Sequence, residues 1–288
     1  MKSKSSNKNL HNANRAKNDE FYTRLEDIEV ELFHYKDHFK GKVVFCNCDD
    51  PVESNFWEYF KLKFEDFGLK KLISTHFEKD KPSYKLEMTS YKKEPIKTRL
   101  KQNGDFRSEE CVEILKEVDI VVTNPPFSLF REYIAQLIEY KKKFVVVGNQ
   151  NATGYKEIFP LIKDNKIWLG KTYPKHFIQP DKSIKNFGNI RWFTNLRINK
   201  YQEEIILYKT YKGNENYYHK YDNYNAINID EVKHIPKDFK GVMGVPITFL
   251  DKYNPKQFEI IKFRKGNDEK DLSIDGKCPY SRILIKKI

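Results

Sequence analysis

Short apolar runs alternate with segments of helical period along most of the chain. The runs end at turn residues, and the segments between them repeat apolar side chains every three or four positions. This alternation is typical of βαβ units and predicts an α/β fold built on a largely parallel sheet. The expected strands are 42–47, 69–77, 119–124, 144–149 and 166–170, with 189–196 as a closing antiparallel strand.

The expected helices lie between these strands. Aromatic residues recur at helical spacing over 54–67, and Ser108 stands where it can cap the first turn of a helix over 108–118. Residues 130–138 follow the same period. A further helical stretch is expected at 155–163, and a short strand at 84–88 within a lysine-rich segment.

The pattern changes at both ends of the chain. Residues 1–20 are polar and basic without periodicity, which predicts a flexible tail, held by an anionic or structural partner or simply disordered. After about residue 200 only scattered strand-like pieces remain. We therefore expect a main α/β domain over 21–200 and a smaller β-rich region over 201–288. The pieces in that region are 203–211, 244–250, 258–263 and 281–287.

Composition favours a polyanionic partner. The 288 residues carry 53 Lys and Arg against 41 Asp and Glu, a net charge of +12, and nucleic acid is the first partner to consider. Heavy use of Lys, Asn, Ile and Tyr also follows from an AT-rich genome, whatever the protein does. The charge therefore supports nucleic-acid binding without deciding it.

Several classes of protein are disfavoured. The four cysteines have neither a disulfide framework nor paired C-x-x-C zinc spacing, and the seven histidines form no metal-like cluster, so metal-free chemistry is expected. The N-terminus has no apolar signal segment. The longest mostly apolar run, 241–250, is far shorter than the ~18 residues of a membrane span. These features predict a soluble, cytoplasmic protein without a membrane partner.

The sequence Asn124-Pro125-Pro126-Phe127 directly follows the expected strand 119–124. Polar groups at strand ends lie at the carboxyl edge of the sheet, where open α/β folds bind ligands. Methyl transfer to an exocyclic amino group needs such a set, because that nitrogen's lone pair is delocalised into the ring. Two acceptors, the Asn124 side-chain oxygen and the Pro125 carbonyl, would favour a pyramidal nitrogen. Consecutive prolines stiffen the loop, and Phe127 can stack on a base.

The alternative is that this tetrapeptide is an ordinary turn between a strand and a helix, with Phe127 in the core. Its position after the strand Asp-Ile-Val-Val-Thr, inside an alternating α/β chain, favours the catalytic interpretation.

At this point the chain resembles a known family, the S-adenosylmethionine-dependent adenine-N6 DNA methyltransferases of the EcoRI-methylase type. The segments that carry the resemblance run nearly the whole length: KNDEFYT, VVFCNCDDP, GDF, VVTNPPF, VVVGNQN with KIWLG, RWFTNL and MGVPITFLDKYNPKQFEI. The resemblance implies a Rossmann-like domain that binds S-adenosylmethionine and a smaller C-terminal target-recognition region. It also implies methylation of a flipped-out adenine in double-stranded DNA, protecting that DNA against restriction.

The resemblance implies where the cofactor binds. The family's loop after the first strand often reads D-P-F-x-G-x-G; this chain keeps Asp50-Pro51 and lacks both glycines, which weakens the match there. Asp105 matches the carboxylate that accepts the cofactor's adenine amino group, and Glu78 is the nearest candidate for a ribose ligand. The expected cofactor-binding residues are Phe21, Tyr22, Thr23, Asn47, Asp49, Asp50, Pro51, Phe77, Asp105, Phe106 and Asn124.

Each cofactor assignment has a structural alternative. The negative charges of Asp49 and Asp50 could instead stabilise the N-terminus of the following helix through its dipole. Asp105, which follows Gly104, could be an ordinary turn residue. Phe21 and Tyr22 could be ordinary core residues.

Target reading is expected in the region after about residue 171. Basic side chains position phosphates, while Asn, Gln and Arg read base edges. A solvated lysine face is the alternative for each single Lys. The candidate DNA contacts are Asn149, Arg191, Trp192, Lys233 and Lys237. A monomer is expected, and two other functions stay open: a methyltransferase acting on RNA or a protein glutamine, and a non-catalytic DNA-binding module.

Overall fold

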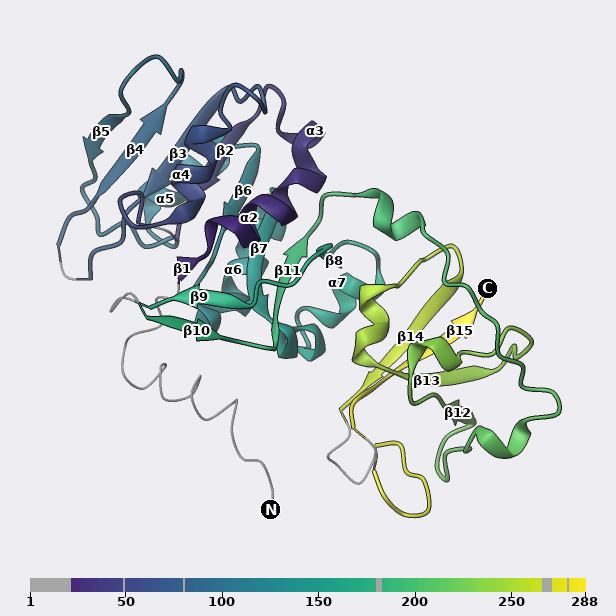
Figure 1. Ribbon diagram of the computed structural model, residues 1–288. Helices are drawn as coiled ribbons and strands as arrows, with labels where there is room; N and C mark the ends of the chain where they lie inside the picture. Colours follow the sequence, from purple (N-terminus) through teal and green to yellow (C-terminus); the bar gives the residue numbers. More distant parts are fainter. Residues whose placement is uncertain (1–21, 49, 80, 180–182, 266–270, 279) are drawn as a thin grey trace. The chain divides into compact units, whose positions relative to one another are not determined.

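The computed structural model describes residues 22–48, 50–79, 81–179, 183–265, 271–278 and 280–288 (Figure 1). The chain divides into two compact units. The first is drawn from residues 1–152 and 169–196, and the second from residues 153–168 and 197–288. The functional division expected at residue 200 stays a prediction.

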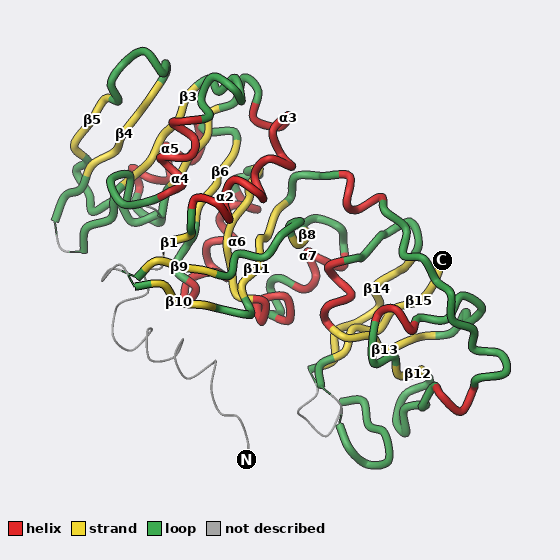
Figure 2. The backbone as a smooth tube through the Cα atoms, viewed as in Figure 1, coloured by secondary structure: helices red, strands yellow, loops and turns green. Residues whose placement is uncertain are grey.

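The main sheet has eight strands in the order β5-β4-β3-β2-β6-β7-β11-β8. The three central pairs, β3–β2, β2–β6 and β6–β7, are parallel, whereas β3–β4, β4–β5 and β7–β11 are antiparallel. The predicted α/β class is therefore confirmed, with a parallel centre and antiparallel additions. Figure 2 shows the strands in yellow and the helices in red. The strands are β2 (Val43–Cys46), β3 (Lys71–Thr75), β4 (Tyr84–Met88), β5 (Ile96–Arg99), β6 (Ile120–Thr123), β7 (Lys143–Asn149), β8 (Trp168–Leu169) and β11 (Ile190–Thr194).

The order of the strands reverses beside β2. The chain passes from β2 outward to β3, then returns to β6 on the other side of β2 and continues outward to β7. Such a reversal opens a crevice at the carboxyl ends of the strands, because the connections leave it in opposite directions. The residues that follow β2 and β6 therefore face the place where a ligand is expected.

Helices cover both faces of this sheet. Trp192 packs edge-to-face on Phe56 of α4 (Asn55–Leu62), with ring centroids 6.0 Å apart, and its neighbour Phe193 packs on Phe130 of α6 (Phe130–Glu139) at 4.9 Å. Successive side chains of a strand point to opposite faces, so α4 and α6 lie on opposite sides of β11. The remaining helices of the first unit are α2 (Leu25–Leu32), α3 (Lys36–Phe39) and α5 (Glu109–Glu117).

Local sequence signals explain where two of these helices begin. Ser108 Oγ accepts a hydrogen bond from Cys111 N at 3.3 Å, so the predicted cap of α5 is confirmed. Ser54 Oγ likewise accepts from Phe56 N at 3.1 Å at the start of α4. The predicted helix over 54–67 is too long, because α4 ends at Leu62. Phe64 and Phe67 keep the apolar period only because the turn after the helix also packs into the core.

A small second sheet of the first unit has the order β1-β9-β10, with both pairs antiparallel. Its strands are β1 (Tyr22–Thr23), β9 (His176–Ile178) and β10 (Ile184–Asn186). Tyr22 pairs with Ile178, which joins the start of the described chain to a hairpin far along the sequence. None of these strands was predicted, because each is too short to show a period.

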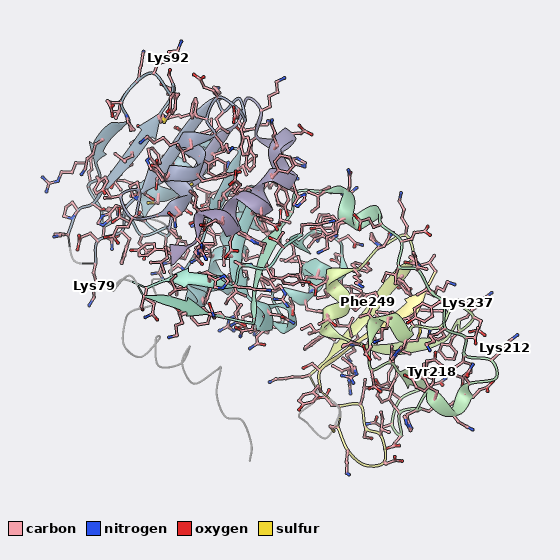
Figure 3. All side chains as sticks on the ribbon, viewed as in Figure 1. Lys79, Lys92, Lys212, Tyr218, Lys237 and Phe249 are labelled. Atoms are coloured by element: carbon pink, nitrogen blue, oxygen red, sulfur yellow. The ribbon has the colours of Figure 1, made fainter. Side chains whose placement is uncertain are left out.

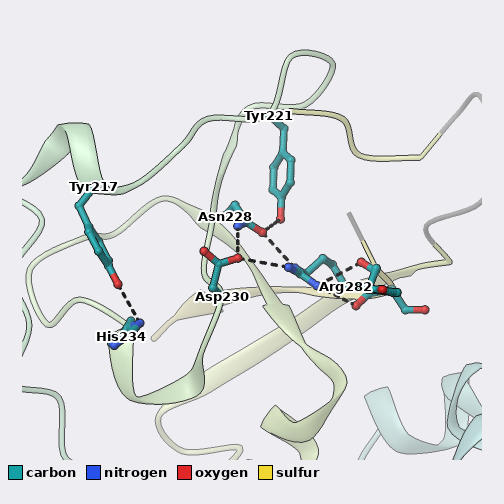
Figure 4. Close-up of polar contacts among 8 residues, drawn as sticks. Tyr217, Tyr221, Asn228, Asp230, His234 and Arg282 are labelled. Atoms are coloured by element: carbon teal, nitrogen blue, oxygen red, sulfur yellow. Dashed lines mark hydrogen bonds and ion pairs between the residues drawn. The ribbon is translucent and has the colours of Figure 1, made fainter. Parts of the chain in front are cut away.

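The second unit is built on a four-stranded sheet in the order β12-β13-β15-β14. The strands are β12 (Ala226–Asn228), β13 (Val242–Pro246), β14 (Phe258–Arg264) and β15 (Arg282–Lys287), and the unit also holds α7 (Phe159–Lys163). Beside the sheet, Tyr221, Asn228, Asp230 and Arg282 form a connected polar cluster (Figure 4).

Three predicted elements of the second unit are wrong in part or entirely. The helix over 155–163 begins only at Phe159, because Pro160 lacks an N–H and fits only the first turn. The strand over 203–211 is absent: Ile205 bonds through N and O to the Gln257 side chain, and Ile206 is 85% exposed. The strand over 244–250 stops at Pro246 and continues as a 3₁₀ turn. No helix within the described residues is long and apolar enough to cross a membrane.

Candidate active site

A cavity of about 270 Å³ opens at the carboxyl edge of the first unit's main sheet. It lies beside the strand reversal, between the ends of β2, β3 and β6. The predicted site residues that line it are Tyr22, Asn47, Asp50, Phe77, Asp105, Phe106, Asn124 and Pro126. The sequence thus brings segments that are far apart along the chain to one cavity, because their strands end at the same edge.

The tetrapeptide that begins at Asn124 follows β6 without a gap. Asn124 and Pro126 are half-buried and line the cavity, and Pro125 is buried between them. Phe127 is half-buried and starts a 3₁₀ turn, closed by a hydrogen bond from Leu129 N to Pro126 O at 3.0 Å. Pro125 and Phe127 do not line this cavity. The loop therefore presents Asn124 toward the cavity and keeps the Phe127 ring outside it.

Asn47, directly after β2, lines the cavity and carries a buried side-chain donor. The residue is 2% exposed, and its side-chain oxygen accepts a hydrogen bond from Tyr133 Oη on α6. Its Nδ2 is buried and has no partner among the described residues. A buried donor left without an acceptor costs about 1–3 kcal/mol. The side chain is therefore suited to a ligand that brings an acceptor.

Asp105 is held by a two-pronged ion pair with Arg107. Arg107 Nε donates to Asp105 Oδ1 at 2.9 Å and Nη2 donates to Oδ2 at 2.7 Å. The hydrogen bonds from Arg107 hold the pKa of the Asp105 carboxyl below its ordinary value, and Asp105 in turn raises the pKa of Arg107. Asp105 is thus an ionised acceptor at neutral pH. Because a carboxylate has about four lone-pair positions, it can still accept a bond from a ligand.

The backbone beside Asp105 approaches β3 closely. Gly104 has a φ of +78°, and a Cβ atom there would lie 2.0 Å from the carbonyl oxygen of His76. A side chain at this position would force the two walls of the cavity apart. Glycine is therefore required for Asp105 and His76 to line the same space.

His76, Asp50 and Tyr84 form a polar cluster, of which His76 and Asp50 line the cavity. His76 Nε2 lies 3.3 Å from Asp50 Oδ2, and Tyr84 Oη donates to Asp50 Oδ1 at 3.4 Å. The His76 and Tyr84 rings stack with centroids 5.0 Å apart. Burial, followed by the charge of Asp50, raises the pKa of Tyr84 to about 12, so its hydroxyl stays a donor. This cluster fixes the Asp50 carboxylate at the cavity.

Another hydrogen bond joins the small sheet to the lining of the cavity. Tyr22 Oη donates to Glu53 Oε2 at 2.6 Å, and both residues line the cavity. Six lining residues were not predicted: Cys48, Glu53, His76, Gly104, Arg107 and Leu129. Most stand one to three residues from a predicted one, and that proximity was the only signal in the sequence.

Several predicted cofactor residues lie elsewhere. Pro51 and Thr23 are buried outside the cavity lining, with the Thr23 carbonyl accepting a hydrogen bond from Asn55 Nδ2 at 2.8 Å. Glu78 is not part of the lining and pairs with Lys81 at 3.7 Å. Phe21 and Asp49 lie outside the described residues.

The predicted DNA contacts are dispersed. Trp192 is fully buried against Phe56, so its assignment as a DNA contact is wrong: the alternation of β11 directs this ring into the core. Asn149 ends β7, and Arg191 lines a second pocket of the first unit.

The other two predicted contacts belong to the second unit. Lys233 pairs with Glu231 at 2.7 Å. Lys237 also belongs to the second unit, as does Lys212, and both are labelled in Figure 3. The backbone carbonyl of Lys237 accepts a hydrogen bond from Lys287 Nζ at 2.7 Å. Over the described part of the chain, no three His, Cys, Asp or Glu side chains are grouped so that they could hold a metal ion.

Comparison with known proteins gives concordant matches over the whole chain. A family model described as "Adenine-specific methyltransferase EcoRI" matches residues 9–288, which confirms the resemblance stated above and the predicted class of enzyme. The Type II methyltransferase M.EcoRI of Escherichia coli is 49% identical over 320 residues, covering 99% of this chain and 98% of that protein.

Two relatives come from mycoplasmas. Type II methyltransferase M.MpnI of Mycoplasma pneumoniae is 43% identical over 313 residues, and M.MgeORF184P of Mycoplasma genitalium is 39% identical over 313 residues. Each alignment covers 96% of this chain and 98% of the relative. No solved structure matches the chain significantly.

Proposed function

Because the chain belongs to the family of EcoRI-type adenine-specific methyltransferases, we propose that it transfers the methyl group of S-adenosylmethionine to N6 of an adenine in duplex DNA. The observation that carries the proposal is the position of Asn124 and Pro126. They line the same cavity as Asp105 and Asn47, at the edge of the sheet where the strand order reverses.

The cavity residues fit such a cofactor. Asp105 offers an ionised acceptor for an adenine amino group, with the Phe106 and Phe77 rings beside it as apolar surfaces. Asp50, fixed by His76 and Tyr84, offers a second carboxylate suited to ribose hydroxyls. The buried Nδ2 of Asn47 offers a donor for a carboxylate or hydroxyl oxygen. When bound there, S-adenosylmethionine supplies an electrophilic methyl group.

Residues 124–127 would hold the acceptor base. The amino group donates one hydrogen bond to the Asn124 side-chain oxygen and one to the Pro125 carbonyl. These two bonds localise the lone pair of the nitrogen for attack on the methyl group. Pro126 fixes the backbone between these acceptors and Phe127, and the half-buried Phe127 ring provides the surface on which the base stacks. The remaining acceleration comes from holding nitrogen and methyl carbon in line.

The acceptor N6 is paired inside a DNA duplex, so the target adenine must leave the stack to reach this edge. The relatives are named type II methyltransferases, which supports a role in protecting specific DNA sites against restriction. We assign target recognition to residues 201–288, where Lys233 and Lys237 would position phosphates, and we expect the protein to act as a monomer.

The proposal is tested by incubating the purified protein with methyl-labelled S-adenosylmethionine and unmethylated plasmid DNA. The expected product is N6-methyladenine, detected after the DNA is digested to nucleosides. Label on an RNA or protein substrate, with none on DNA, would contradict the proposal. Protection of the treated plasmid against a panel of restriction enzymes then identifies the site.

A further inference from the structure

A second pocket lies in the first unit, apart from the cofactor cavity. It measures about 380 Å³, and its lining includes Tyr173, Lys175, His176, Gly188 and Arg191. They come from β9, from the segment before it, from the turn that leads into β11, and from β11 itself, which carries Arg191. The pocket shares no lining residue with the cavity that contains Asn124.

Arg191 gives this pocket a fixed positive charge. The residue is 9% exposed, its guanidinium lies 4.2 Å from the centroid of the Tyr173 ring, and Nη1 donates to the Ile190 carbonyl at 2.8 Å. A guanidinium stays protonated at every physiological pH and carries five donors in a rigid fork that matches phosphate oxygens. Its position over the Tyr173 ring orients the plane of the guanidinium at the pocket.

Lys175 and His176 extend the basic lining. Lys175 is exposed and His176 is half-buried. The Asp27 carboxylate is nearby, but it accepts the backbone N–H of Lys175 at 3.3 Å and leaves the ammonium group of that residue in solvent. A pocket with one buried guanidinium and an exposed ammonium at its rim is suited to an anion with several oxygens.

A buried carboxylate holds the segment that enters this pocket. Glu31 is fully buried on α2; Oε1 accepts from Lys171 N at 2.9 Å and Oε2 accepts from Thr172 N at 2.6 Å. Thr172 Oγ1 and Tyr35 Oη also donate to it, both at 2.7 Å. Because these bonds fix the backbone immediately before Tyr173, the pocket is formed before any ligand arrives, which lowers the entropic cost of binding.

Strand register places the pocket at the same edge of the sheet as Asn124. Arg191 pairs with Gly148 of β7, whereas Thr123 pairs with Val146, so Arg191 stands at the level of Pro125. Two strand spacings, about 10 Å, separate β11 from β6. The small sheet gives a second connection, since Tyr22 lines the cofactor cavity and pairs with Ile178, two residues from His176.

We infer that this pocket binds a backbone phosphate of the DNA strand that carries the target adenine. That the bound polyanion is DNA rests on the proposed function. That a phosphate binds in this pocket rests on the charge and position of the pocket itself. The phosphate contact fixes the strand at the sheet edge while the base enters the site at Asn124.

Gly188 allows a clean test, because Arg191 is too deeply buried to be replaced without disturbing β11. A Cβ atom at Gly188 would meet nothing within 4 Å, so the pocket tolerates a side chain there. The test variant is Gly188→Asp, which adds a carboxylate, and the matched control is Gly188→Asn, which has nearly the same shape without charge. Lys175→Gln is a second variant at an exposed position.

Binding is measured by fluorescence anisotropy with a short labelled DNA duplex of mixed sequence over a series of salt concentrations. For Gly188→Asp we expect weaker binding and a slope of log affinity against log salt that is shallower by about 1, as for one lost phosphate contact. Gly188→Asn should keep the parent slope, and Lys175→Gln should reduce affinity less than Gly188→Asp. Cofactor binding should be unchanged in all three.

Equal affinities and slopes for Gly188→Asp and Gly188→Asn would overturn the phosphate pocket, whether both match the parent or both are weakened. Failure of the parent protein to methylate DNA would instead contradict the proposed function. The two failures are distinguishable because the anisotropy measurement needs neither cofactor nor turnover.

Discussion

The two units differ in how far their buried polar side chains have hydrogen-bond partners within the protein. The sheet edge of the first unit and the polar cluster of the second show this difference. In the second unit Asn228 Oδ1 accepts from Tyr221 Oη at 2.8 Å and from Arg282 Nε at 3.0 Å, while Asn228 Nδ2 donates to Asp230 at 2.8 Å (Figure 4). Both side-chain polar atoms of Asn228 thus have partners inside their own cluster. At the sheet edge of the first unit, Asn47 Nδ2 has none among the described residues.

The difference separates two uses of buried polar side chains. A cluster closed on itself contributes to folding, because each donor is matched without outside help. A cluster with spare donors and acceptors loses some stability in the free protein and regains it when a ligand supplies the missing partners. Substitutions in the two regions should therefore affect different quantities: turnover or ligand binding in the first, and the free energy of unfolding in the second.

Asn124→Ala should have the largest effect. If the Asn124 side-chain oxygen accepts a hydrogen bond from the reacting amino group, as proposed, its loss should lower kcat by about 100-fold or more, by analogy with the loss of one oxyanion-hole group. Cofactor affinity, measured by calorimetry, should stay close to the parent value because Asp105 and Asn47 are retained. Methyl incorporation at the parent rate would show that Asn124 does not hold the acceptor base.

Phe127→Ala should have the next largest effect. Loss of base stacking costs about 1–3 kcal/mol, or about 5- to 150-fold in kcat/KM for DNA. Phe127→Tyr keeps an aromatic ring and is the matched control, expected to retain most activity. Equal activity of the Ala and Tyr variants would mean that the ring does not contact the base.

Asn228→Ala should act on stability alone. It removes the acceptor of the Tyr221 hydroxyl, whose residue is only 5% exposed, and an unpaired buried group of this kind costs about 1–3 kcal/mol. Urea unfolding should show this loss in the transition that reports the second unit, whereas cofactor binding should be unchanged. Asn225→Ala, at an exposed position in the same region, is the control and should unfold like the parent protein.

Arg107→Gln should give the smallest effect, visible in the pH dependence. The hydrogen bonds from Arg107 lower the pKa of Asp105, so removing them raises that pKa toward its ordinary value. If ionised Asp105 accepts the cofactor's amino group, affinity falls as pH drops through this pKa, and the fall should begin at a higher pH in the variant. Calorimetric titrations over the acidic range measure it, and Arg107→Lys should lie between the two. If the pH midpoint of cofactor affinity does not change in the variant, Asp105 does not bind the cofactor.

The features that could be predicted from the sequence are those specified locally. The cap at Ser108, the antiparallel strand that became β11, and the position of Asn124 after β6 each depend on residues within one element and its ends. The sheet does not close at β11 as expected, because β8 lies beyond it. The tetrapeptide was recognisable because its chemistry is unusual and its place after a buried strand is readable from periodicity.

The features that could not be predicted depend on pairs that are distant in sequence. Nothing near His76 in the sequence indicates that it meets Asp50, and nothing near Tyr22 indicates that it pairs with Ile178. Trp192 was misjudged because its neighbours on the strand do not reveal which face packs on α4. The pairing of Arg107 with Asp105 could have been predicted, since a basic residue two positions after an aspartate can donate hydrogen bonds back to its carboxylate.

The pairing of β1 with β9 has a thermodynamic consequence. Tyr22, which lines the same cavity as Asn124, and His176, which lines the second pocket, belong to adjacent strands of one small sheet, so a shift of one strand disturbs the other. When a ligand in the cavity or in the second pocket orders that sheet, the entropic cost of ordering it is lower for the ligand that binds second. Linkage makes the gain reciprocal: any factor by which the methyl donor tightens DNA binding is also the factor by which DNA tightens binding of the donor.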